Sequence, residues 1–267
     1  MAAARATGLR RGTEILIALG SDEALARDGL GVVRIAQIVG HEKSQVSRAL
    51  SALAASGFVD RDPDSRAYRL GWRLFALAAR SGRPQLISHA SGVLRGLVSA
   101  TGETAHLSVL QAGQVLTLVS EAPPSAITAI GWSGRTVPVV CTSSGRALLF
   151  DHDLPALEAL LKQASFVGYG QAAPGDMSEL YRRILAGRGR GYATVDEEFE
   201  QGLVGVAAPV RDFAGRIIAA VNVSGPKFRL GSRLAATGEA VRGAAEALSE
   251  SMFSAPAATT REGSVTA

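Results

Sequence analysis

The chain has 267 residues, of which 47% are hydrophobic and 19% charged, so it can bury one large core or two ordinary ones. It contains no run of about 20 apolar residues, as a membrane helix requires, and its first residues lack the apolar segment of a secretory signal. We therefore expect a cytoplasmic protein with no membrane partner. A single cysteine excludes an internal disulfide, and four scattered histidines form no metal-ligand motif, so we expect no metal and no cofactor.

Positive charge is concentrated toward the N-terminus. Residues 1–83 carry 13 Lys and Arg against 8 Asp and Glu, whereas residues 84–267 carry 15 against 16. Such an asymmetry indicates that the first third contacts a polyanion while the remainder has another role. A solvated basic face without a partner explains the charge equally well, so the residue pattern has to decide between the two.

Residues 32–56 have the pattern of two short helices joined by a tight turn. They follow an apolar helix expected at residues 14–19 and a polar stretch at 21–31. Apolar side chains recur at helical spacing in residues 32–39, and Gly40 ends that segment. The second helix places four apolar side chains on one face, namely Val46, Ala49, Leu50 and Leu53. This arrangement predicts a helix-turn-helix.

The opposite face of the second helix carries hydroxyls, an amide and an arginine but no acid. Gln45 can form two hydrogen bonds with adenine, Arg48 can bind guanine or phosphate, and serines can bind bases or backbone. A carboxylate there would repel phosphate. A solvated helix in a small helical domain is the alternative, but the glycine turn and the acid-free face favour DNA recognition.

A β-hairpin is predicted directly after this helix. Residues 58–61 and 66–70 are expected as strands around a turn at 62–65. Arginines flank the hairpin tip and could reach the DNA backbone or minor groove. The residues expected to contact DNA are Arg34, Lys43, Ser44, Gln45, Ser47, Arg48, Arg61, Arg66 and Arg69. The apolar helix that follows, from Trp72 to Ala78, is too hydrophobic for a free linker and should pack against another surface.

The rest of the chain is predicted as an α/β domain. Strands are expected at 106–110, 115–121, 127–132, 137–140, 204–210 and 216–223, and helices at 85–100, 144–150, 178–188 and 235–252. Strands joined by hairpins predict an antiparallel sheet flanked by helices.

No catalytic constellation is present in the sequence. His106 has no neighbouring motif, Cys141 has no flanking histidine or basic cluster, and neither G-x-S-x-G nor H-E-x-x-H occurs. We therefore expect no enzyme, and we interpret Cys141 as a small, semi-buried packing residue.

Several motifs follow one another along nearly the whole chain. It begins with RIAQIVGHEKSQVSRALSALAASGFVDRDPDSRAYRLGWRLFALA and continues with TSSGRALL and DEEFEQGLVGVAAPVRDFAGRIIAAVNVSGP. Over residues 13–249 this succession resembles the IclR-type transcriptional regulators. The resemblance implies an α+β protein with a winged helix-turn-helix, a linker helix and a C-terminal GAF-like effector-binding domain with an antiparallel sheet. It also implies dimers or tetramers, with the linker helices packed at the dimer interface.

Two short segments are candidates for binding a small molecule. Backbone N–H groups of Ser143, Ser144 and Gly145 begin an apolar helix and could receive a carboxylate, while Asn222 and Ser224 share one face of a strand. Taken alone, Ser143 and Ser144 are better explained as a helix cap, and Asn222 and Ser224 as polar residues on a solvent-facing side of the strand. The resemblance implies that matching segments line the effector cavity of the family. The candidate effector residues are Ile130, Ser143, Ser144, Gly145, Asp196, Leu203, Gly205, Asn222 and Ser224.

These observations predict a division into residues 1–70 for DNA binding, 71–83 as a linker helix, 84–252 for effector binding and 253–267 as a disordered tail. We expect a repressor that binds a pseudo-palindromic double-stranded operator and is controlled by a small organic acid or aromatic metabolite. The alternative is a protein that does not bind DNA and uses the winged domain only for assembly. Salt-dependent binding to DNA would separate the two.

Overall fold

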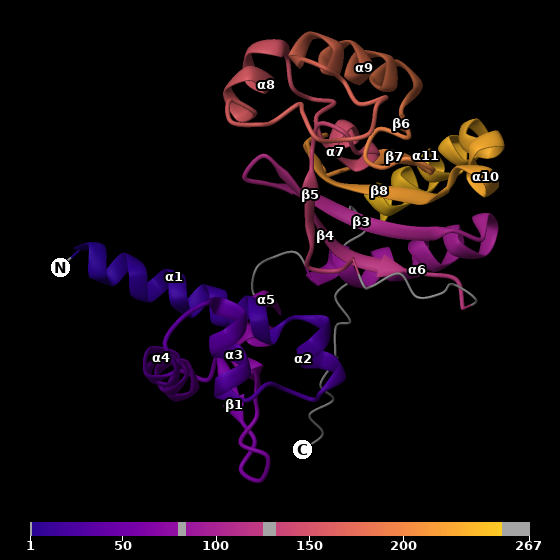
Figure 1. The fold of residues 1–267 in the computed structure, drawn as a ribbon. Helices are drawn as coiled ribbons and strands as arrows, with labels where there is room; N and C mark the ends of the chain where they lie inside the picture. Colours follow the sequence, from indigo (N-terminus) through magenta and orange to yellow (C-terminus); the bar gives the residue numbers. More distant parts are fainter. Residues whose placement is uncertain (1, 80–83, 125–131, 253–267) are drawn as a thin grey trace, which may run out of the picture. The chain divides into compact units, whose positions relative to one another are not determined.

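The computed structural model describes residues 2–79, 84–124 and 132–252, and the chain divides into two compact units, residues 1–84 and 85–267. The first unit is mainly helical (Figure 1). Its elements are α1 (Ala2–Leu19), α2 (Asp22–Ala26), α3 (Val32–Val39), α4 (Lys43–Ala55), β1 (Val59–Arg61), β2 (Tyr68–Leu70) and α5 (Trp72–Ala79). None of the helices in the described part of the chain is long and apolar enough to cross a bilayer.

The helix-turn-helix is formed by α3 and α4, as the apolar spacing predicts. Gly40 ends α3 in the left-handed conformation, with φ at 67°, which a glycine adopts without steric cost. The core of the unit joins these helices to α1 and to the hairpin through Ile15, Leu19, Leu30, Ile35, Val46, Leu50, Val59 and Tyr68. Two differences from the predicted elements are that α1 begins at Ala2 and that the polar stretch contains α2.

The hairpin of β1 and β2 forms the predicted wing. The strands pair antiparallel, with Val59 opposite Leu70, and Leu30 forms a bridge to Tyr68. At the turn, Oδ1 of Asp62 accepts hydrogen bonds from the backbone N–H of Ser65 at 2.8 Å and from its hydroxyl at 2.8 Å. These bonds lower the pKa of Asp62 and hold the turn in one shape.

The second unit is built on a six-stranded antiparallel sheet in the order β5-β4-β3-β8-β7-β6. Its strands are β3 (Thr104–Gln111), β4 (Gln114–Glu121), β5 (Thr136–Pro138), β6 (Ala193–Asp196), β7 (Leu203–Arg211) and β8 (Ile217–Pro226). Its helices are α6 (Pro84–Thr101), α7 (Ser143–Leu148), α8 (Leu154–Leu160), α9 (Met177–Arg190), α10 (Lys227–Leu230) and α11 (Leu234–Ser251), with a short 3₁₀ turn at Gly231–Arg233.

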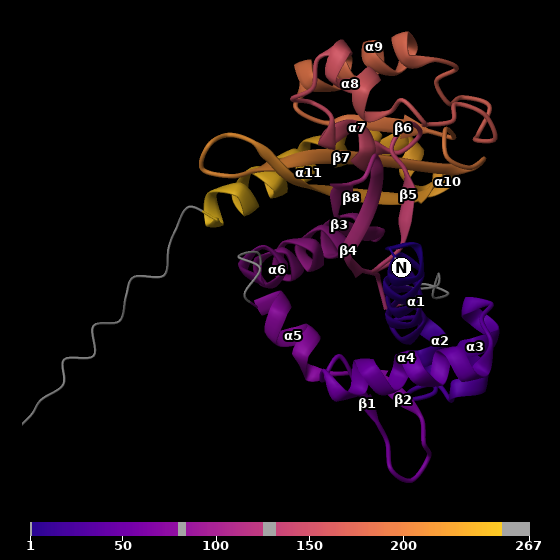
Figure 2. The same cartoon turned by 90° about the vertical axis from the view of Figure 1, so that its left-hand side faces the viewer.

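Helices cover both faces of this sheet. Figures 1 and 2 show α7, α8 and α9 on one side and α6 on the other. Residues alternate between the faces along each strand, so Val221 and Val223 of β8 join the core under α6 and α11, while Ala220 joins the core under α7. The α+β fold with an antiparallel sheet is therefore confirmed.

Several expected boundaries differ in the second unit. The sequence did not predict β6, α8 or α10, and the strand expected at 137–140 is β5 at 136–138. The strand expected at 127–132 lies outside the described residues except for Trp132, which is not in a strand. The tail expected at 253–267 also lies outside them.

Candidate functional site

The first candidate site is the outer face of α4 in the helix-turn-helix. Lys43, Ser44, Ser47 and Arg48 are exposed there, and Gln45 is half-buried. Val46 and Leu50 hold the opposite face of the helix in the core, which leaves these side chains free to face a partner. Within the described residues, Lys43 and Arg48 have no acidic side chain as a partner, so both charges remain available for phosphate or bases.

Two of the expected DNA-binding arginines are already paired with acids. The guanidinium of Arg34 binds Glu23 through two hydrogen bonds of 2.8 Å, which raise the pKa of Arg34. Arg69 donates to the carboxylate of Asp28 at 2.5 Å and to its backbone carbonyl at 2.6 Å. Arg34 thus ties α2 to the start of α3, and Arg69 ties the loop between α2 and α3 to the wing.

The other two wing arginines are more accessible. Arg61 lies over the ring of Tyr68, with its guanidinium carbon 5.3 Å from the ring centroid. Arg66 is exposed at the hairpin tip with φ at 57°, in the left-handed region. Neither has an acidic partner among the residues that the structure describes. The wing therefore presents two cations without acidic partners among the described residues, one in β1 and one at the hairpin tip.

The second candidate site is a pocket between the sheet and α7. It holds about 590 Å³ of space, including its open mouth. Its wall is formed by His106, Ser108, Val115, Thr117, Trp132, Val137, Thr142, Ser143, Ser144, Val195, Phe199, Leu203, Val204, Gly205, Asn222 and Ser224. Gly205 leaves room here, because a Cβ atom at this position would lie 3.2 Å from the hydroxyl of Ser143.

Buried polar side chains converge on this pocket. Ser108, Thr117, Ser143, Ser144 and Asn222 are all buried, yet none of their side chains forms a hydrogen bond with another described residue. Ser108, Thr117 and Asn222 lie on the sheet face below α7, and Ser143 and Ser144 belong to the first turn of α7. The apolar residues that alternate with the strand residues fill the core on the other face of the sheet. Buried polar groups are nearly always satisfied, so the wall is suited to a ligand that offers several hydrogen bonds.

Among the described residues of the pocket wall, His106 is the one with a titratable side chain. Burial lowers its pKa to about 4, because a charged imidazole would lose its hydration, so the ring is uncharged near neutral pH. Nε2 lies 3.4 Å from the hydroxyl of Ser224, and Nδ1 has no hydrogen-bond partner within the described residues. The ring also meets that of Trp132 edge to face, at 6.4 Å between centroids.

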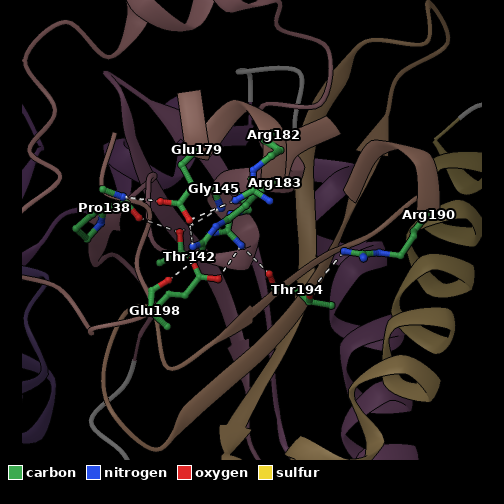
Figure 3. Close-up of polar contacts among 12 residues, drawn as sticks. Pro138, Thr142, Gly145, Glu179, Arg182, Arg183, Arg190, Thr194 and Glu198 are labelled. Carbon is green, nitrogen blue, oxygen red and sulfur yellow. Dashed lines mark hydrogen bonds and ion pairs between the residues drawn. The ribbon is translucent and has the colours of Figure 1, made fainter. Parts of the chain in front are cut away.

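A network of buried charges lies next to the pocket (Figure 3). Arg146 of α7 pairs with Glu198 and donates to the carbonyl of Thr194 at 2.7 Å, and Arg183 of α9 reaches Glu198 at 3.0 Å. Glu198 directly precedes Phe199, which lines the pocket. The network thus fixes the segment that carries Phe199 to α7 and α9.

The structure brings most of the expected effector residues together. Those that line the pocket are Ser143, Ser144, Leu203, Gly205, Asn222 and Ser224. Gly145 does not line it, because its N–H donates to Thr142 Oγ1 at 3.2 Å and a Cβ atom there would meet the Val139 backbone. Asp196 is also outside the wall, exposed and 2.9 Å from Lys227. Ile130 lies outside the described residues.

Sequence reasoning missed several residues of the wall, chiefly His106, Ser108, Thr117, Trp132 and Phe199. The alternation of polar and apolar residues in β3 was a signal for the first two. Cys141 is not in the wall. It is fully buried under α7, which raises the pKa of its thiol to about 12.

Comparison with known families identifies both units. Residues 8–63 match the IclR helix-turn-helix domain, and residues 80–250 match the C-terminal domain described as bacterial transcriptional regulator IclR C-terminal. The chain belongs to the IclR family. It is therefore a DNA-binding transcriptional regulator of the helix-turn-helix type, and assembly without DNA binding is not favoured.

Similar IclR-family proteins extend along most of the chain. The HTH-type transcriptional regulator BhcR of Paracoccus denitrificans is 34% identical over 229 residues, which cover 84% of this chain and 81% of that protein. The HTH-type transcriptional regulator XynR of Escherichia coli is 31% identical, covering 73% of this chain and 78% of that protein. These relatives are transcriptional regulators rather than enzymes.

Solved IclR-family structures have the same fold. A regulator from Silicibacter is similar with a TM-score of 0.70 and 26% identity, covering 93% of this chain and 97% of that one. An IclR homologue from Microbacterium hydrocarbonoxydans, solved in complex with 4-hydroxybenzoate, has a TM-score of 0.77 and 24% identity, covering 93% and 100%.

Proposed function

We propose that this regulator is a cytoplasmic repressor whose operator binding is controlled by a small organic acid or aromatic metabolite bound between α7 and the sheet. The observation that carries the proposal is the set of buried polar side chains that meet in the pocket without hydrogen bonds to other described residues. The Microbacterium homologue in complex with 4-hydroxybenzoate and the relatives named as AllR repressors support it.

Residues 1–70 bind DNA in this proposal, 71–83 form the linker helix and 84–252 bind the effector. Direct contacts to the operator come from Lys43, Ser44, Gln45, Ser47, Arg48, Arg61 and Arg66, while Arg34 and Arg69 position the wing and α3. The protein acts as a dimer or tetramer on a pseudo-palindromic operator. Two recognition helices of a dimer then lie about 34 Å apart, one turn of DNA.

The effector pocket is tested by screening metabolites in a thermal-shift assay with the wild type and with Gly205→Val. The valine side chain would project toward Ser143 and occupy the pocket, so the variant should lose the stabilisation by a metabolite that the wild type shows. A gel-shift titration on the upstream DNA should then show that this metabolite changes operator affinity only for the wild type. A metabolite that acts equally on both proteins would contradict the proposal.

Operator binding itself is tested by the salt dependence of the same gel shift. Affinity should fall steeply with salt, since cations on α4 and the wing displace counterions from phosphate. Absence of salt-dependent binding to the upstream DNA would instead favour the alternative in which the winged unit serves only for assembly.

A further inference from the structure

The C-terminal end of helix α4 is held in one conformation by its own backbone. The N–H of Phe58 donates to the carbonyl of Leu53 at 2.9 Å. The N–H of Gly57 donates to the carbonyl of Ala54 at 2.9 Å, and Gly57 has φ at 71°. These two bonds and the left-handed glycine are the features of a Schellman motif. The last turn of the recognition helix is therefore fixed relative to Phe58, which leads into the wing.

The residues that end α4 also hold the start of α5. The N–H of Gly71, between β2 and α5, donates to the carbonyl of Phe58 at 2.8 Å. The N–H of Arg73, in the first turn of α5, donates to the carbonyl of Gly57 at 3.3 Å. The first N–H groups of a helix need acceptors from outside it, and the segment that follows α4 supplies one here. The negative end of the α4 dipole thus lies next to the positive end of the α5 dipole, which stabilises the contact.

The backbones at this junction are too close for any side chain at Gly71. A Cβ atom there would lie 2.9 Å from the carbonyl carbon of Phe58 and 2.9 Å from the backbone nitrogen of Val59. It would lie closer still to the carbonyl oxygen of Gly57. Since all three are backbone atoms, an alanine at position 71 has to push the start of α5 away from the end of α4.

The side chain of Arg73 adds a second link between the two helices. Its Nη1 donates to the carbonyl of Ser56, the last residue of the α4 turn, at 3.2 Å. Its guanidinium carbon also lies 6.0 Å from the ring centroid of Phe58. Arginine side chains commonly bind the free carbonyls at a helix C-terminus. Here the arginine belongs to the next helix, so the bond joins α5 to α4.

The rest of α5 has little hold on the first unit. Within the described residues, no side chain of α5 belongs to the apolar core of this unit, and Trp72, Phe75 and Leu77 are exposed. The direction of α5 relative to α4 therefore depends on the junction at its first turn. The chain continues from α5 into the second unit, so any link between the DNA-binding units that runs through the rest of the chain acts on α4 through this junction.

We propose that Gly71 and Arg73 are positioning residues that join α4 and α5 into one rigid body and thereby fix the spacing of the operator half-sites that the regulator accepts. The inference rests on the proposed binding of a dimer to a pseudo-palindromic operator. It adds which residues make that binding selective for spacing. A rigid connection lets both recognition helices enter the major groove only at one separation, whereas a loose connection tolerates several.

Two DNA fragments test the role of Gly71. The first is the upstream fragment that the wild type protects from DNase, and the second has two base pairs inserted between its half-sites. The insertion moves the half-sites apart by about 7 Å and rotates them by about 70°. In anisotropy titrations of the full chain, the wild type should bind the natural fragment at least tenfold more tightly than the lengthened one. Gly71→Ala should reduce this ratio to less than threefold, mainly by losing affinity for the natural fragment.

Gly12→Ala is the matched control, because its added Cβ atom in α1 meets no side chain or neighbouring element within 4 Å. It should keep the full ratio. Arg73→Ala is the second variant, which decides the matter if Gly71→Ala does not fold, and it should at least halve the ratio. Loss of a phosphate contact would instead lower both affinities by the same factor and leave the ratio unchanged. Arg27→Ala, at an exposed arginine of the same unit, should also keep the full ratio.

A wild-type ratio below threefold would overturn the inference, and so would variants at Gly71 and Arg73 that both keep the wild-type ratio. Either result leaves operator binding itself in place. The proposed function fails separately, when the wild type protects no upstream DNA and binds neither fragment in a salt-dependent manner. That result would overturn the spacing role together with the operator on which it rests.

Discussion

Single side chains on α4 divide into those that can recognise bases and those that hold the helix in place. Gln45 and Arg48 lie on the face opposite the buried Val46 and Leu50. We predict that Gln45→Ala or Arg48→Ala weakens operator binding by about 1–3 kcal/mol for each lost base contact, with a smaller loss on random DNA. Fluorescence anisotropy titrations on both DNAs measure this, and equal losses on the two would contradict base recognition.

Arg66→Ala is the contrasting variant, since Arg66 lies at the wing tip and is proposed to bind phosphate. It should weaken binding to operator and random DNA alike, and it should reduce the slope of log affinity against log salt by about 1. A change confined to the operator would assign Arg66 to base recognition instead.

His106 gives the protein a predictable dependence of stability on pH. The pKa of a free histidine is about 6.5, whereas burial lowers that of His106 to about 4. Between these values the unfolded chain binds a proton that the folded chain does not, so the free energy of unfolding falls as the pH falls. We expect this residue to account for about 2 kcal/mol between pH 7 and pH 5.

Denaturant unfolding of the wild type and His106→Gln at pH 7 and pH 5 measures this effect. The variant should lose less stability on acidification by about that amount. His89→Gln is the control and should keep the wild-type dependence, because its side chain is exposed. If His106→Gln keeps the full dependence, His106 is protonated in the folded protein and the explanation is wrong.

Helices with a clear hydrophobic periodicity were predicted from the sequence, whereas most of the short helices and strands were missed. Helices α3 and α4 were predictable because their buried residues recur at helical spacing and Gly40 ends the first of them. Helix α2 has five residues and β6 has four, too few to show a period. Helix α8 was missed although Asp153 caps its N-terminus and Pro155 follows, which is a recognisable helix start.

The pocket was predictable only in part. Asn222 and Ser224 could be placed on one face of a strand from their spacing, but their common neighbour His106 could not, because strand order is not local information. The sequence argument considered His106 only as a catalytic group. A further obstacle is the register shift between Leu107 and Ser108, which changes the pairing of β3 with β4.

Helix α5 carries an apolar surface that the first unit does not bury. Trp72 and Phe75 are exposed, and their rings meet edge to face at 6.1 Å between centroids. We propose that this surface mediates self-association and transmits the effector signal. Phe75→Ala should therefore change operator affinity or its coupling to the ligand, although Phe75 belongs to neither site.

Paired titrations, with calorimetry for the ligand and anisotropy for the operator, measure this coupling. Phe213→Ala removes another exposed phenylalanine, from the turn between β7 and β8, and should have no effect. If Phe75→Ala also leaves DNA binding, ligand binding and their coupling unchanged, α5 is only a tether.

At the scale of the whole molecule, the proposed control of operator binding by a ligand requires a difference in the ligand's affinity between states. A ligand that binds all states of the assembly equally cannot change operator occupancy, however tightly it binds. The ligand must therefore favour one arrangement of the DNA-binding units. If the operator favours the same arrangement, the ligand strengthens operator binding, and if the operator favours a different one, the ligand weakens it. The sign of regulation follows from which of the two applies.

The pairing of Arg34 with Glu23 and of Arg69 with Asp28 determines how the regulator responds to ionic strength. An arginine that already holds a carboxylate adds no net charge, so its approach to DNA releases no counterion. Of the side chains proposed to contact DNA, the four unpaired cations Lys43, Arg48, Arg61 and Arg66 then contribute, and log affinity should fall against log salt with a slope of about −3.6 for each protomer. Glu23→Gln should steepen this slope by about 0.9 and tighten binding in dilute buffer, whereas an unchanged slope would mean that the freed Arg34 does not reach phosphate. Asp28→Asn should have a smaller effect, because Arg69 also lies 3.7 Å from the carboxylate of Asp62. The two acids thereby make the regulator less sensitive to changes in salt concentration than its number of surface arginines suggests.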